Sequence, residues 1–119
     1  MSVTGIDHVQ VAAPAGCEAE ARAFYGDLLG LEELPKPEPL AARGGCWFRA
    51  GAQELHVGVE DPFTPARKAH PGLVVGDLDA LGTRLRAAGI EVSYGDTIRG
   101  AKRFHAADPF GNRLEFRQG

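Results

Sequence analysis

The chain opens with an alternating segment, Ile6-Asp7-His8-Val9-Gln10-Val11-Ala12, in which polar and apolar side chains take turns. A period of two is typical of a β-strand with two unlike faces. Val9 and Val11 fall on the face that we expect to pack against a helix, and His8 falls on the opposite face. The first predicted strand therefore carries a histidine away from the predicted core.

After this strand, the first half of the chain predicts a helix followed by a hairpin. Residues 16–29 follow helical spacing, and Gly30 stands where a left-handed helix end is expected. Three prolines between residues 34 and 39 exclude a helix or a central strand, so we expect a loop or a sheet edge. Residues 46–49 and 54–59 predict a hairpin around the turn at 50–52.

The same order of elements returns in the second half. Residues 70–75 predict a strand, and Asp77 or Asp79 is placed to cap a helix that runs through Ala88. Three further strands are predicted at residues 90–94, 103–107 and 112–117, the last two around a tight turn at 108–111. The chain therefore reads β-α-β-β-β twice, with a period of about sixty residues. We predict an α+β fold.

Four residues of types that bind metal occupy related places in the two halves. His8 and His70 stand at the first strand of each half, and His56 and Glu115 stand in the last strand of each half. Alternation turns His56 away from its apolar neighbours, and it does the same for Glu115. Three imidazoles and one carboxylate are a ligand set for a divalent metal ion. The sequence predicts a metal site made of His8, His56, His70 and Glu115.

Three motifs in this order resemble the vicinal oxygen chelate superfamily, which includes glyoxalases, bleomycin-resistance proteins and extradiol dioxygenases. They are Ile6-Asp7-His8-Val9, then Phe24-Tyr25-Gly26-Asp27-Leu28-Leu29-Gly30-Leu31, and finally Asp108-Pro109-Phe110-Gly111-Asn112-Arg113-Leu114-Glu115. The resemblance implies two paired βαβββ modules, at about residues 5–60 and 69–117, that form one open U-shaped barrel around a cleft. It also implies a single glyoxalase-like domain over residues 1–119, with homodimers common among its members.

In metal-dependent members of the superfamily, the ligand positions correspond here to His8, His70 and Glu115. Glyoxalases add a fourth ligand, normally Glu, where this chain has His56. We therefore expect His56 to be a fourth ligand, a proton carrier or a residue lining the cleft. The resemblance implies a glyoxalase-like lyase or isomerase that uses Zn, Ni, Mn or Fe on a small substrate with adjacent oxygens. The alternatives are a dioxygenase, a fosfomycin-type thiol transferase, and a metal-free binder of a drug or metabolite.

His105 is a second candidate catalytic residue, because the related strand of fosfomycin transferases carries a substrate-facing tyrosine. Strand parity alone does not decide which face His105 occupies. Three basic residues precede it, and they form either an ordinary solvated loop or a group that holds an anionic part of a substrate. They are Arg99, Lys102 and Arg103.

Composition narrows the class of protein. The 119 residues carry a formal net charge of −3 without a block of Lys or Arg, which argues against nucleic acid and anionic membrane surfaces as partners. Apolar runs are too short for a membrane span. Two cysteines do not make a disulfide framework, and we expect a cytoplasmic protein acting on a small molecule.

Overall fold

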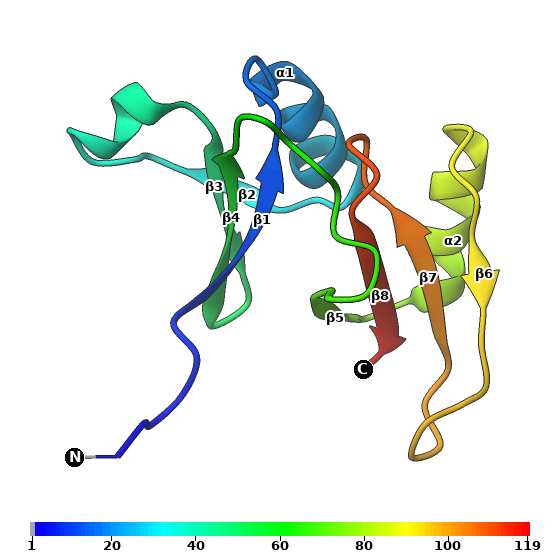
Figure 1. The fold of residues 1–119 in the computed structure, drawn as a ribbon. Coiled ribbons are helices and arrows are strands. Elements are labelled where there is room, and N and C mark those ends of the chain that lie inside the picture. Colours follow the sequence, from blue (N-terminus) through cyan, green and yellow to red (C-terminus); the bar gives the residue numbers. More distant parts are fainter. Residues whose placement is uncertain (1) are drawn as a thin grey trace. The chain divides into compact units, whose positions relative to one another are not determined.

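Each half of the chain forms its own four-stranded mixed sheet, as the repeated pattern predicts (Figure 1). The computed structural model describes residues 2–119, which divide into two units between Thr64 and Pro65. We call these units module 1 and module 2. The prediction of an α+β fold built from two βαβββ modules is confirmed.

Module 1 has the strand order β1-β4-β3-β2. β1 runs parallel to β4, whereas β3 is antiparallel to both β4 and β2. Its elements are β1 (His8–Ala13), α1 (Glu18–Ala21), a π-helical continuation (Arg22–Leu28), β2 (Glu32–Leu34), a 3-10 helix (Leu40–Arg43), β3 (Cys46–Ala50) and β4 (Gln53–Val59).

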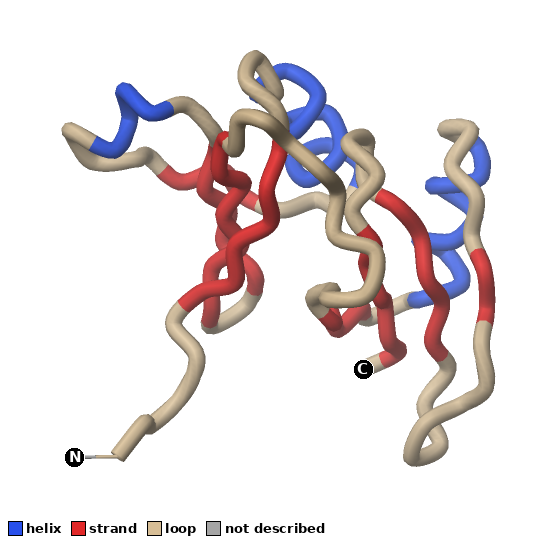
Figure 2. Tube along the Cα trace, viewed as in Figure 1, coloured by secondary structure: helices blue, strands red, loops and turns tan. Residues whose placement is uncertain are grey.

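Module 2 repeats this arrangement with the strand order β5-β8-β7-β6, and α2 lies behind β7 in the view of Figure 1. Figure 2 shows the loops that connect its strands. Asp77 caps α2, because its Oδ1 accepts a hydrogen bond from the Ala80 N–H at 3.1 Å. The elements are β5 (Gly72–Val75), α2 (Leu78–Ala87), β6 (Ser93–Tyr94), β7 (Arg103–Ala107) and β8 (Arg113–Gln118).

The core of each module lies on the apolar face of its sheet. Phe48, Leu55 and Val57 are fully buried in module 1, and Phe104 and Leu114 are fully buried in module 2. Burying one such side chain stabilises a fold by about 1.5–3 kcal/mol. The strands are thus held with their apolar side chains inward, and alternation turns their polar residues to the opposite face.

Several predicted boundaries differ from the structure. β1 begins at His8 rather than Ile6, and Val9 is 38% exposed because the first half of this edge strand is not covered. β5 begins at Gly72, so His70 precedes the strand. The strand predicted at residues 90–94 is reduced to Ser93–Tyr94. Within residues 2–119, no helix has the length and apolar character needed to cross a membrane.

Candidate functional site

The polar face of sheet β5-β8-β7-β6 carries His105 and Glu115 side by side. In β7, Phe104 and Ala106 are buried, so His105 points to the opposite face. The register pairs His105 directly with Glu115 of β8, and paired residues share a face. The structure therefore answers the question that sequence alone left open about His105.

His70 joins these two residues from the segment that precedes β5. Its Nε2 lies 3.1 Å from Glu115 Oε1, and His105 Nε2 lies 3.5 Å from the same oxygen. One ligand atom from each of the three residues falls within 4.8 Å of the others. We call His70, His105 and Glu115 the donor cluster.

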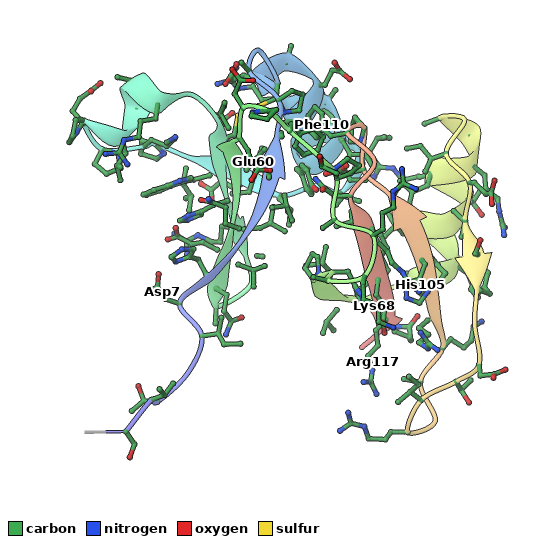
Figure 3. The ribbon with its side chains drawn as sticks, in the orientation of Figure 1. Asp7, Glu60, Lys68, His105, Phe110 and Arg117 are labelled. Carbon is green, nitrogen blue, oxygen red and sulfur yellow. The ribbon has the colours of Figure 1, made fainter. Side chains whose placement is uncertain are left out.

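A backbone carbonyl fixes how His70 presents its ring. His70 Nδ1 lies 2.8 Å from the Lys68 carbonyl oxygen, in the segment that Figure 3 marks by Lys68. Because a carbonyl only accepts, Nδ1 carries the hydrogen, and in the neutral ring Nε2 presents a lone pair. That lone pair faces a carboxylate oxygen, so the two atoms are joined either by a proton on Nε2, which makes a hydrogen bond to Glu115, or by a cation in its place. Two imidazoles and a carboxylate are donors that fit a divalent transition metal ion.

Charge within the donor cluster favours the protonation states that bind metal. Burial raises the pKa of Glu115, but the hydrogen bond with His70 and the charges of Arg103, His105 and His70 outweigh it, so its pKa lies below the usual value. Burial lowers the pKa of His105, and the charge of Arg113 lowers it further. A carboxylate that stays ionised and an imidazole that stays neutral are the forms that coordinate metal.

Module 1 brings His8 and His56 together in a different way. His56, only 5% exposed, stacks on the His8 ring at a centroid distance of 4.2 Å and on the Trp47 ring at 4.1 Å. Because β4 lies between β1 and β3, His8 and Trp47 cover opposite faces of the His56 ring. We call these three side chains the ring stack. The two histidines of the ring stack also bond to carboxylates, His56 Nε2 to Glu54 and His8 Nδ1 to Asp7, both at 2.9 Å.

The predicted site residues thus fall into two groups, one in each module. The structure brings His70 and Glu115 together with His105, and it brings His8 and His56 together with Trp47. The stacking of Trp47 on His56 was not among the predicted contacts. The hairpin turn contained the signal, because strands closing around residues 51–52 place Trp47 opposite His56.

Of the three basic residues that precede His105, Arg103 lies close to the donor cluster. Its Nη1 lies 3.8 Å from Glu115 Oε1, and its Nε donates to the Asp96 carbonyl oxygen at 3.0 Å. Lys102 instead bonds Asp79 at 2.7 Å. Two other residues that sequence analysis did not single out, Arg67 and Arg113, line a pocket of about 470 Å³ beside His105, which we call the module 2 pocket.

Module 1 has a pocket of its own, with a volume of about 620 Å³. The ring stack forms one of its walls, and the Lys36 and Arg43 side chains line another part. Lys36 Nζ donates a hydrogen bond to the Gly44 carbonyl oxygen. Each module therefore combines imidazoles with neighbouring cationic side chains.

Comparisons with known proteins agree with this architecture. The family model of the Glyoxalase/Bleomycin resistance protein/Dioxygenase superfamily matches residues 5–116. A glyoxalase family protein from Bacillus anthracis is 54% identical, with a TM-score of 0.94 over 100% of this chain and 98% of that chain. No curated protein matches the chain at a significant level.

More distant solved structures share the fold. Lactoylglutathione lyase from Agrobacterium tumefaciens is 24% identical, with a TM-score of 0.75 over 100% of this chain and 96% of that chain. The fosfomycin resistance protein FosX from Listeria monocytogenes is 15% identical, with a TM-score of 0.78 over 99% of this chain and 95% of that chain. At these identities the likeness concerns the fold alone.

Proposed function

Because the chain belongs to the Glyoxalase/Bleomycin resistance protein/Dioxygenase superfamily, we propose that it is a metal-dependent enzyme, a glyoxalase-like lyase or isomerase. Its substrate would be a small molecule with adjacent oxygens, and its cofactor a divalent ion such as Zn, Ni, Mn or Fe. The donor cluster is the observation that carries this proposal, since three ligand atoms converge within 4.8 Å.

Three residues of module 2 would hold the ion. The Lys68 carbonyl keeps the Nε2 lone pair of His70 turned toward Glu115, and Glu115 supplies the negative charge. His105 Nε2 approaches the same oxygen and is either the third ligand or a group that gives or takes a proton. When bound, a divalent ion acts as a Lewis acid that stabilises negative charge developing on a substrate oxygen.

His8 and His56 remain predicted metal ligands on the basis of the sequence. For His56, a role as proton carrier is the alternative, and its contacts support that role. With the Nε2–H held by Glu54, the neutral ring keeps an unprotonated Nδ1, which is the atom that would accept a proton. Substituting each histidine separately and measuring metal affinity and activity distinguishes a ligand from a proton carrier.

Elemental analysis of the purified protein tests the proposal most directly. We expect close to one divalent ion per chain after purification or after reconstitution with Zn, Ni, Mn or Fe. A stoichiometry far below one that none of these ions restores would favour the alternative, a metal-free binder of a drug or metabolite. A lactoylglutathione-type isomerisation assay with the reconstituted protein then tests the reaction class.

Three further expectations belong to this proposal. We propose a homodimer, which light scattering coupled to size-exclusion chromatography would test. A single functional domain over residues 1–119 follows from the superfamily resemblance, and expression of residues 65–119 alone would test whether one module suffices. A cytoplasmic location is supported by the two cysteines, Cys17 and Cys46, which are both buried and unbridged.

A further inference from the structure

The module 2 pocket places two arginines beside the donor cluster. Its lining includes Arg67 and Arg113, the hydroxyl-bearing Ser93, and His105, which is itself a member of the donor cluster. Ser93 pairs with His105 in the β6–β7 register, so both point to the same face of the sheet. A ligand in this pocket therefore lies next to the atoms proposed to hold the metal ion.

The backbone explains why the two arginines line one pocket. The Arg113 N–H donates to the Ala66 carbonyl oxygen at 2.9 Å, and the Ala66 N–H donates to Asn112 Oδ1 at 3.0 Å. Arg67 directly follows Ala66, so the start of β8 and the segment carrying Arg67 are hydrogen-bonded neighbours. Arg113 also precedes Glu115 by two residues in β8 and shares its face.

Neither guanidinium has an acidic partner among residues 2–119, whereas other arginines do. Arg22 bonds Glu33 at 2.9 Å, and Arg103 lies near Glu115. Guanidinium groups bind carboxylates and phosphonates through two parallel hydrogen bonds, and such charge-assisted bonds are strong.

One acid, Glu91, also lines the pocket. Two arginines against one exposed glutamate leave the lining with a net positive charge when His105 is neutral. That balance disfavours a cationic ligand and favours a singly or doubly charged anion. Glu91 also gives a variant with the opposite expected effect, because its removal increases the positive charge.

We propose that the module 2 pocket binds an oxyanion group, a carboxylate or a phosphonate, through Arg67 and Arg113. The substrate class is then a small anionic compound whose adjacent oxygens reach the donor cluster while its oxyanion lies against the two arginines. The identification of this anion as a part of the substrate rests on the proposed function. Binding of the anion itself requires no metal.

Benzoate, phenylphosphonate and neutral benzamide make a matched set of probes. Each is titrated into chelator-treated and zinc-loaded protein, and binding is followed through the backbone amide NMR signals of residues 105–113. We expect saturable shifts with the two anions and binding at least about 10-fold weaker with benzamide, in line with the strength of charge-assisted hydrogen bonds. The anion that binds more tightly identifies the chemistry of the substrate's tail.

Arg113→Gln and Arg67→Gln should each weaken binding of the tighter anion by about 10-fold, and Glu91→Gln should strengthen it. Arg117→Gln is the matched control, because Arg117 lies on the same strand and face but donates to the Ile98 carbonyl oxygen and does not line the pocket. Equal binding of benzoate and benzamide, or arginine variants that bind like the control, would overturn the inference. Anion binding to a protein that takes up no metal would instead refute the proposed function and leave this pocket in place.

Discussion

The two modules carry different chemistry at equivalent positions of the same strand pattern. His56 of β4 corresponds to Glu115 of β8, because Trp47 pairs with the former as His105 pairs with the latter. In module 1 the aromatic rings meet face to face, with 15° and 5° between their planes. In module 2 the His70 and His105 rings meet edge to face at 77°, and their Nε2 atoms converge on one carboxylate oxygen.

Two residue exchanges account for this difference. Module 1 has Trp47 where module 2 has His105, and an indole ring has no lone pair to offer a metal ion. Module 1 also has His56 where module 2 has Glu115, so an aromatic ring takes the place of a carboxylate. Rings on neighbouring strands stack because the strands are about 4.8 Å apart. The same backbone therefore builds a ring stack in one module and a donor cluster in the other.

The largest expected effect is the loss of metal from the donor cluster. His70→Ala and Glu115→Ala should each lower zinc affinity by at least about 100-fold, since even residues one shell further out change metal affinity by 10–100-fold. Competition with a chromophoric chelator measures the affinity. Tight binding retained in both variants would show that module 2 does not hold the ion.

Making module 1 resemble module 2 at one position should destabilise the metal-free protein. His56→Glu places a carboxylate in a buried position against Trp47 and close to Glu54, where it loses a hydrogen bond and meets a like charge. We expect a loss of about 2 kcal/mol in the free energy of unfolding at pH 7, measured with urea.

Two controls separate charge from shape in this experiment. His56→Gln keeps a neutral donor for Glu54 and should cost less than His56→Glu. Adding Glu54→Gln to His56→Glu removes the like charge and should restore part of the stability. If all three variants were equally stable, the surroundings of His56 would not favour a ring over a carboxylate.

A smaller effect is expected from removing one ring of the ring stack. Trp47→Leu keeps an apolar side chain but loses the parallel contact with His56. We expect a loss of about 1 kcal/mol in the free energy of unfolding, with most of it recovered in Trp47→Phe. A Leu variant as stable as the Phe variant would show that the stacking contributes nothing beyond burial.

The smallest effect concerns pH and module 2. The pKa values of His105 and Glu115 are both lowered in the folded protein, so the unfolded chain takes up protons first as the pH falls. The stabilisation from His105 is present above its unfolded pKa of about 6.5 and is lost as the pH falls through the folded value. Metal-free protein should therefore unfold more easily at pH 5.5 than at pH 7.5.

His105→Gln is the control for this pH dependence. It removes the imidazole whose pKa is lowered by burial, so its loss of stability between pH 7.5 and 5.5 should be smaller than that of the unsubstituted protein. Guanidinium unfolding at the two pH values measures both proteins. An equal loss in the variant would assign the effect to other groups.

The sequence predicted the repeated modules and the faces of the central strands, because alternation and core burial obey the same period. His56 between Leu55 and Val57, and Glu115 between Leu114 and Phe116, lie on the predicted faces. The family resemblance was also confirmed.

The contacts between strands were harder to predict, since they depend on register. The position of His105 beside Glu115 follows from the β7–β8 pairing, and that of Trp47 beside His56 from the β3–β4 pairing. The bond between Lys68 and His70 involves a backbone carbonyl in a loop, which no side-chain pattern reveals. Likewise, Arg67 and Arg113 are 46 residues apart in the sequence, and the hydrogen bonds that Ala66 makes with Arg113 and Asn112 bring their segments together.

The turn between β7 and β8 (Phe110 in Figure 3) has a consequence for how such proteins diverge. Asp108 Oδ1 accepts from the N–H groups of Phe110 and Asn112, both at 2.9 Å, and the buried Asn112 side chain is anchored in turn to Asp108 Oδ2 and the Ala66 N–H. These hydrogen bonds determine which residues of β8 face the core and which face the polar side of the sheet. One residue inserted between this turn and β8 would move each β8 side chain to the other face of the sheet, with Glu115 in the apolar core and Leu114 on the polar face. Insertions and deletions in the β7–β8 turn would thus be selected against. Substitutions on the polar face leave the core unchanged and can alter the activity.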